Sequence, residues 1–137
     1  MRVRAPVTLP LVAALTTSLL TAAGLAMAQS GRGDPAAGDP VAGEELFLDH
    51  CVICHIAEGG GQGPSLNGLY GRKAGAIEGF AYSAAVRDSG LTWSGPQLDR
   101  FLTNPIQALP GTAMPILVAD PKDRSDLIAY FASKKIP

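Results

Sequence analysis

Two cysteines and a histidine lie within one five-residue segment, Cys51-Val52-Ile53-Cys54-His55. On a helix, residues three apart share a face, so both thiols can reach one edge of a single porphyrin. The C-x-x-C-H spacing is typical of covalent haem attachment, in which the thiols bond to two vinyl groups and the histidine ligates the iron. The segment therefore predicts one haem c, bound through Cys51 and Cys54 with His55 as an axial ligand.

Other uses of the two thiols are less well supported. A disulfide between Cys51 and Cys54 would close a very short loop and constrain little. A structural zinc site would have to draw on His50 and His55, the only histidines in the chain, to complete four ligands. Since His50 directly precedes Cys51, it belongs to the same side of the porphyrin as His55, and we expect it on the surface of a helix.

Met114 is the only methionine after residue 28, and it lies in the loop Pro110-Gly111-Thr112-Ala113-Met114-Pro115. Methionine most often fills gaps in a core. The flanking prolines and the glycine instead favour a fixed presentation of the thioether, a soft ligand that suits ferrous iron. We predict Met114 as the second axial ligand. A His/Met pair leaves the iron no vacant position, which favours electron transfer over catalysis.

The first 28 residues have the features of a secretory signal peptide. Arg2 and Arg4 precede an uncharged, largely apolar run that ends in small residues at Ala28. We expect cleavage after Ala28 and a periplasmic protein with no stable membrane insertion. A retained anchor is the alternative, because the run approaches the roughly 20 residues that cross a bilayer.

The rest of the chain, residues 29–137, has the length of one domain. Without Arg2 and Arg4 the chain has nine basic and twelve acidic side chains, a formal charge near −3, and nothing in it indicates nucleic-acid binding. Residues 29–39 lack large apolar side chains and are rich in glycine, proline and aspartate, which predicts a flexible leader. The folded domain is then 40–137.

The two ends of this domain carry helix-start signals, in which a capping aspartate precedes a proline. Asp39-Pro40 predicts a helix over residues 40–54, and Asp120-Pro121 predicts a last helix. An apolar stripe of Leu127, Ile128 and Phe131 marks the buried face of the last helix. Its C-terminal end carries the cations that the helix dipole favours, Lys134 and Lys135.

The middle of the chain is rich in loops. Short helices are expected at about residues 82–89 and 94–103, the second capped by Ser94. Glycine-rich residues 57–79 and proline-rich residues 104–115 are expected to be irregular. With no convincing strand, the fold class is all-α, with long loops wrapped around one haem.

The ordered motifs between residues 41 and 134 resemble those of class I c-type cytochromes, especially the mitochondrial type and the bacterial cytochrome c2-like proteins. Besides C-V-I-C-H, the matching segments are GPSLNGLYGRKAG at 63–75, GFAYSAA at 79–85, GLTW at 90–93, FLTNP at 101–105, PGTAMP at 110–115 and DLIAYF at 126–131. The resemblance implies that the first and last helices cross. Gly43 and Phe47 would then meet Leu127 and Tyr130.

The resemblance also implies which residues surround the haem. Pro64 resembles the proline whose preceding loop carbonyl helps to orient the ligand histidine. Arg72, Tyr82 and Trp93 resemble groups that neutralise or hydrogen-bond the buried propionates. Such donors are needed because a buried carboxylate is costly without compensation.

On the methionine side, Leu102 resembles core that packs on the haem, and Thr112 and Asn104 resemble polar residues that steady the loop. Two residues depart from the mitochondrial pattern. Phe101 replaces a tyrosine whose hydroxyl reaches toward the methionine sulfur, and Val86 replaces a common buried polar residue. These departures predict a drier distal pocket with fewer hydrogen bonds.

The resemblance implies an electron carrier, and the filled iron site disfavours enzymatic activity. We expect a monomer that shuttles one electron between redox proteins of a respiratory, photosynthetic or dehydrogenase chain. Residues 106–109 and Ala113 lack the lysines of mitochondrial relatives, so an acidic partner of the mitochondrial kind does not carry over. One rival is a haem enzyme or ligand sensor in which Met114 dissociates. Another is an electron-entry subunit of a larger dehydrogenase or oxidase.

Overall fold

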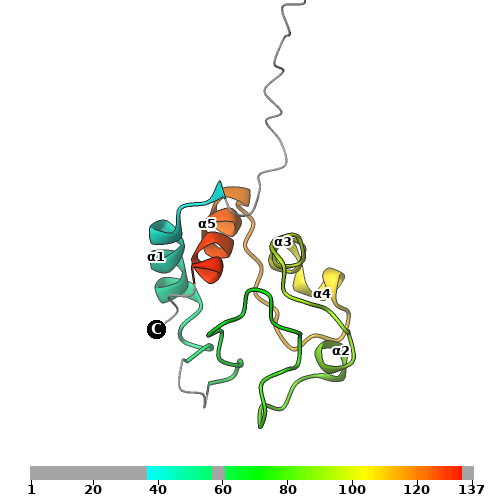
Figure 1. Ribbon diagram of the computed structural model, residues 1–137. Coiled ribbons are helices and arrows are strands. Elements are labelled where there is room, and N and C mark those ends of the chain that lie inside the picture. Colours follow the sequence, from blue (N-terminus) through cyan, green and yellow to red (C-terminus); the bar gives the residue numbers. More distant parts are fainter. Residues whose placement is uncertain (1–36, 57–60, 134–137) are drawn as a thin grey trace, which may run out of the picture.

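The computed structural model describes residues 37–56 and 61–133, which form five helices (Figure 1). In chain order these are α1 (Pro40–His50), α2 (Ala84–Arg87), α3 (Gly95–Thr103), α4 (Pro105–Ala108) and α5 (Pro121–Ala132). These ranges contain no strand, and one isolated bridge joins Lys73 to Thr92. The all-α fold class is confirmed. The expected signal peptide, most of the leader, Lys134 and Lys135 lie outside the described residues.

Both terminal helices begin at the predicted capping residues. The Asp39 carboxylate accepts a hydrogen bond from the Val41 N–H at 2.9 Å, and the Asp120 carboxylate accepts one from the Lys122 N–H at 2.7 Å. Each cap satisfies a backbone donor that has no partner inside its helix, and the proline that follows donates nothing at that position.

Helix α1 ends four residues earlier than predicted, at His50 rather than at residue 54. The Phe47 carbonyl accepts hydrogen bonds from the N–H groups of both Cys51 and Val52, so the regular ladder of the helix stops there. A turn follows, in which the Cys51 carbonyl accepts from the N–H groups of Cys54 and His55 at 3.1 and 3.0 Å. The C-x-x-C-H segment is therefore presented by a turn at the end of α1.

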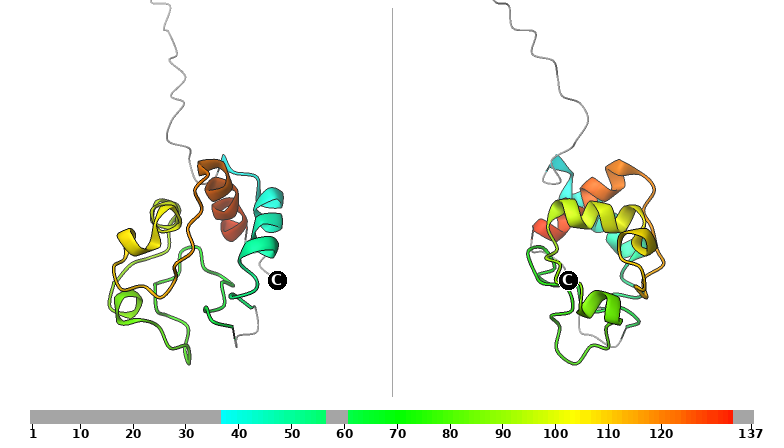
Figure 2. Two further views of the ribbon diagram at one scale, coloured as in Figure 1. Left: turned by 180° about the vertical axis from the view of Figure 1, so that it is seen from behind. Right: turned by 90° about the vertical axis from the view of Figure 1, so that its right-hand side faces the viewer.

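Helices α1 and α5 cross and pack tightly, as the resemblance implied (Figures 1 and 2). A side chain at Gly43 would overlap the Asp126 carbonyl, so glycine permits the close approach of the two backbones. Phe47 and Tyr130 are buried with ring centroids 5.6 Å apart, and Phe131 meets Phe47 edge-on at 6.2 Å. The crossing holds most of the aromatic core.

The middle helices differ in detail from the predictions. The segment 104–115 was expected to be irregular, but α4 occupies its first part, because Asn104 accepts from the Gln107 N–H at 3.0 Å and precedes a proline. Helix α2 is shorter than predicted, and α3 begins after Ser94, whose side chain makes no capping bond. None of the helices in the described part of the chain is long and apolar enough to cross a membrane.

Candidate functional site

A cavity of about 370 Å³ lies between the helices and the long loops. In the right-hand view of Figure 2, α3 (yellow-green) lies above the long green loops. Most of the cavity walls are apolar. The predicted site residues that line it are Cys51, Cys54, His55, Pro64, Arg72, Tyr82, Trp93, Leu102, Thr112 and Met114. In the structure, all ten residues predicted from the sequence to bind the cofactor therefore line one cavity.

The two cysteines are half-buried and not joined by a disulfide. Burial, and secondarily the neighbouring Cys54, raises the pKa of the Cys51 thiol to about 11. A dithiol that exchanges disulfides depends on the opposite change, a depressed pKa that supplies thiolate. The polypeptide environment of Cys51 therefore does not suit disulfide-exchange chemistry.

The imidazole of His55 is fixed by one hydrogen bond, in which Nδ1 donates to the Pro64 carbonyl at 2.8 Å. The acceptor is the carbonyl of Pro64 itself and not that of the preceding residue. Because a carbonyl only accepts, the proton is on Nδ1, and Nε2 keeps its lone pair for a metal. A carbonyl partner of this kind orients the ring and strengthens the ligand.

Gly63 is a residue of this site that sequence reasoning missed. A side chain at position 63 would overlap the His55 ring, so the glycine lets the loop run directly against the imidazole. The only signal was its place before Pro64 in a glycine-rich loop. That loop holds several glycines, so its composition did not single out Gly63.

Met114 is half-buried at the cavity and lies in the segment between α4 and α5. The Thr112 hydroxyl is buried and accepts from the Met114 N–H at 3.4 Å. A turn immediately upstream is closed by the Thr112 N–H, which donates to the Leu109 carbonyl at 3.0 Å. Gly111 lies within it at a φ of 90°, a conformation that side chains disfavour. The loop is therefore shaped by its own backbone contacts.

Three hydrogen-bond donors, Arg72, Tyr82 and Trp93, also line the cavity. The Arg72 guanidinium donates to the carbonyls of Asn67 and Ser65, the latter at 2.9 Å. Partial burial lowers the pKa of Arg72, while nearby Tyr82 acts in the opposite direction. Arginine nevertheless remains a cation at physiological pH, so Arg72 supplies the cavity with a positive charge.

Apolar side chains complete the cavity, and Phe101 and Val86 are among them. Phe101 is buried with its ring centroid 5.0 Å from that of Trp93. The remaining lining residues were not assigned to the site from the sequence, or were noted only for other roles. They include Leu66, Leu69, Phe80, Leu98, Ile116, Leu127 and Phe131. His50 also lines the cavity, and it is exposed, as expected from the sequence.

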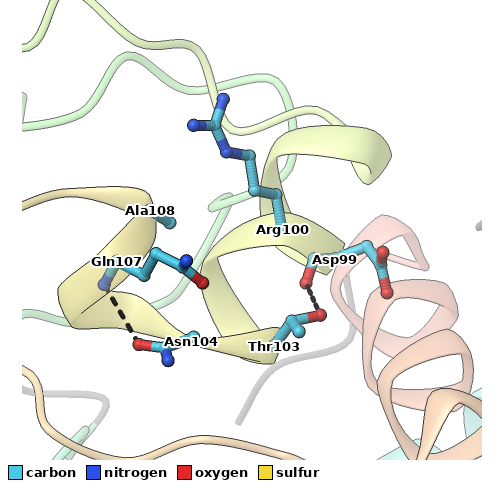
Figure 3. A pocket seen from close by; sticks show the side chains of 6 residues that line it. All are labelled: Asp99, Arg100, Thr103, Asn104, Gln107 and Ala108. Atoms are coloured by element: carbon cyan, nitrogen blue, oxygen red, sulfur yellow. Dashed lines mark hydrogen bonds between the residues drawn. The ribbon is translucent and has the colours of Figure 1, made fainter.

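Asn104, expected on the methionine side, does not line this cavity. Its amide caps α4 beside a second hollow of about 400 Å³, formed where α3 meets α4 (Figure 3). Figure 3 shows the Thr103 hydroxyl directed at Asp99, to whose carbonyl it donates at 2.7 Å. Five of its six lining residues have polar side chains, and it contains none of the thiol, imidazole or thioether groups.

Crossing terminal helices and an apolar cavity that bears C-x-x-C-H define a c-type cytochrome. The cytochrome c family model matches residues 40–135. Among curated proteins, the cytochrome c of Chlamydomonas reinhardtii is 45% identical over 91 residues, 64% of this chain and 81% of that protein. The cytochrome c of Theileria annulata is 46% identical over 102 residues, 72% and 84% of the two chains.

Among solved structures, cytochrome cH from Methylobacterium extorquens matches with a TM-score of 0.66 and 43% identity, over 70% of this chain and 99% of that one. The chain belongs to the cytochrome c family. It is accordingly an electron carrier that acts with redox partners, and it carries haem c attached covalently through Cys51 and Cys54. The apolar cavity with two thiols and an oriented imidazole fits that group.

Proposed function

We propose that the protein is a periplasmic one-electron carrier, not an enzyme, whose haem iron is held by Nε2 of His55 and the sulfur of Met114. The observation that carries this proposal is the hydrogen bond from His55 Nδ1 to the Pro64 carbonyl, 2.8 Å long, within the cavity that Met114 also lines. Because this hydrogen bond uses Nδ1, Nε2 is the ring nitrogen that is available to coordinate the iron. Methionine supplies the second ligand, and this ligand pair is associated with a raised reduction potential.

When bound, haem c supplies a reversible one-electron change at the iron. The chain fixes the geometry around that change. His55 and Met114 would both ligate the iron and leave no position for a substrate, and the apolar side chains of Phe101, Val86 and Leu102 would keep water away. A dry site of fixed geometry favours transfer of an electron without a change of ligands.

The propionates belong beside Arg72, Tyr82 and Trp93 in this proposal. Arg72 is already held by two backbone carbonyls, yet its guanidinium has five N–H groups and can donate further. Tyr82 and Trp93 add a phenol and an indole donor to the same cavity. A positive charge and neutral donors together compensate carboxylates that burial would otherwise disfavour.

The contact surface for redox partners is the part of the cavity rim formed by Ala81, Ala113, Pro115 and Ile116, all exposed. None of the described residues lining the cavity is a lysine. We therefore propose a partner with an apolar, weakly charged face, because charge steering needs complementary charges on both surfaces. Electron transfer from the native donor should depend weakly on ionic strength, and a steep loss of rate with salt would exclude this docking mode.

The proposal includes export, with cleavage after Ala28 and a monomeric product. The Arg2 and Arg4 signal and the small residues before Gln29 support it. Mass spectrometry of the purified native protein should give an N-terminus at residue 29, whereas a retained N-terminus would identify an anchor. Co-purification with a dehydrogenase or oxidase would instead identify a subunit of a larger assembly.

Binding of carbon monoxide by the reduced protein tests the closed iron site. With His55 and Met114 both bound, carbon monoxide should add slowly and incompletely at neutral pH. Prompt, stoichiometric binding in the wild type, together with peroxide turnover, would mean that the protein is a haem enzyme or sensor in which Met114 leaves.

A further inference from the structure

The buried guanidinium of Arg124 joins three separate parts of the chain. Arg124 is on α5 and is 8% exposed. Its Nε donates to the Asp99 carboxylate on α3 at 2.7 Å. Its Nη1 donates to the carbonyls of Val118 and Ala119 at 3.0 and 2.9 Å. The planar guanidinium thus holds a helix on one side and the end of the methionine segment on the other.

The segment that carries Met114 has a fixed point at each end. Upstream, the turn from Leu109 to Thr112 holds it. Downstream, the Val118 N–H donates to the Leu102 carbonyl at 2.8 Å, and the Val118 carbonyl accepts from Arg124. The residues between Met114 and Val118 are exposed, Ile116 by 53% and Leu117 by 52%. Burial of side chains therefore contributes little between Met114 and Val118, and the downstream contacts restrain that part of the loop.

We propose that Arg124 is a positioning residue for Met114. By holding Val118 and Ala119 against α3 and α5, it limits how far the loop can move and keeps the thioether in the cavity. It therefore controls how readily another ligand displaces Met114 from the iron. This inference rests on the proposed His/Met ligation.

The role of Arg124 can be tested separately from that of Asp99, because only one of the three acceptors of Arg124 is the Asp99 carboxylate and the other two are loop carbonyls. Removing the guanidinium leaves the Asp99 carboxylate and both loop carbonyls without this donor. Removing the Asp99 charge leaves the two loop contacts intact. Lysine at position 124 would keep the charge, but an ammonium lacks the planar fork that reaches all three acceptors. We expect the loop to open most in Arg124→Gln, less in Arg124→Lys, less again in Asp99→Asn, and least in the wild type.

Imidazole titration of the ferric holoprotein measures this opening, because added imidazole binds the iron only when Met114 has left. The apparent affinity scales with the population of the open loop. Arg124→Gln should raise it by about tenfold, as expected when a charged donor of several hydrogen bonds is lost. The far-red absorption of methionine-ligated ferric haem should weaken in parallel.

Two controls separate positioning from general destabilisation. Arg87→Gln breaks a solvent-exposed ion pair with Asp88 and should leave imidazole affinity at the wild-type value. Asp126→Asn weakens the hydrogen bond from the Asp39 N–H, which joins α5 to the start of α1, and the ion pair with Lys122 within α5, and it removes none of the contacts of Arg124. It should lower the denaturant midpoint without raising imidazole affinity by a comparable factor.

An Arg124→Gln protein with the wild-type imidazole affinity would overturn the inference. It would also be overturned if Asp126→Asn raised the imidazole affinity as much as Arg124→Gln does at an equal loss of stability. If Arg124→Gln does not accumulate, Arg124→Lys and Asp99→Asn are decisive, and unchanged affinity in both would overturn it equally. A wild type without far-red methionine absorption would instead refute the proposed ligation. A wild type with that absorption, but with unaffected variants, would refute only the role of Arg124.

Discussion

Gly63 allows the main chain to pass directly against the imidazole of His55. We expect Gly63→Ala to force the ring away from the Pro64 carbonyl, because its new methyl group would overlap the ring atoms. Overpacking of this kind costs about 1–3 kcal/mol. Thermal unfolding of the haem-loaded variant should show that loss together with an altered far-red spectrum.

Asn67→Ala is the matched control for this prediction. Asn67 lies in the same loop and its side chain is exposed, so its loss should leave stability and spectrum near the wild type. If Gly63→Ala behaved like Asn67→Ala, the close approach of residue 63 to His55 would not matter to the site.

Site residues with distinctive chemistry could be predicted from the sequence, whereas apolar residues that only fill space around the cavity could not. Two thiols, an imidazole and one downstream thioether can be identified by residue type and spacing, and in the structure all four line one cavity. Leu66 and Phe80 line the same cavity but lie in irregular chain. Without a helical or strand period, nothing in the order of residues shows which apolar side chains face inward.

At the scale of elements, the crossing of α1 and α5 depends on Gly43. We expect Gly43→Ala to lower the free energy of unfolding by about 1–3 kcal/mol, since its methyl group would overlap the Asp126 carbonyl and push the helices apart. Denaturant unfolding of the holoprotein measures the change. Glu45→Ala on the exposed face of α1 is the control and should stay within about 0.5 kcal/mol of the wild type. Equal stability of the two variants would contradict the close packing.

Helix starts were predictable because a cap followed by proline is a local signal. Asp39 and Asp120 begin α1 and α5 as expected. The same signal at Asn104 begins α4, which the prediction of an irregular segment overlooked because prolines dominate its composition. The end of α1 was harder to predict, since it depends on the Phe47 carbonyl accepting two N–H groups, a geometry that residue preferences do not specify.

For the whole molecule, Asp126 ties the start of the domain to its last helix. Its buried carboxylate accepts from the Asp39 N–H at 2.9 Å and from the Lys122 ammonium at 2.5 Å. Burial alone raises the pKa of Asp126, but the hydrogen bonds from Lys122 and Asp39 outweigh it and hold the pKa below its usual value. The carboxylate therefore stabilises the fold at pH values above about 3.9, the pKa of an unfolded aspartate.

This contribution is lost as the pH falls through the depressed pKa of the folded protein. We expect Asp126→Asn to be less stable than the wild type at pH 7, by about 1–2 kcal/mol, with a difference that shrinks in acid. Denaturant unfolding of both holoproteins across the acid range measures it. A difference that stayed constant with pH would show that the Asp126 charge does not contribute.

The overall fold was predictable because its ends are regular and its middle follows a recognisable order of motifs. The sequence did not specify how the loops surround the cavity. That arrangement depends on contacts between distant segments, such as those of Arg124 with Asp99 and of Val118 with Leu102. Such contacts join residues far apart in the chain, and no local pattern records them.

The absorption spectrum of Met114→Ala, compared with the wild type, tests the central claim most directly. Both proteins are expressed with their export signal and haem maturation, and Ile116→Ala, an exposed neighbour at the same cavity, is the control. We predict far-red ferric absorption in the wild type and the control, its loss in Met114→Ala, and prompt carbon monoxide binding by that variant alone. Unchanged far-red absorption and ligand binding in Met114→Ala would contradict ligation of the iron by Met114.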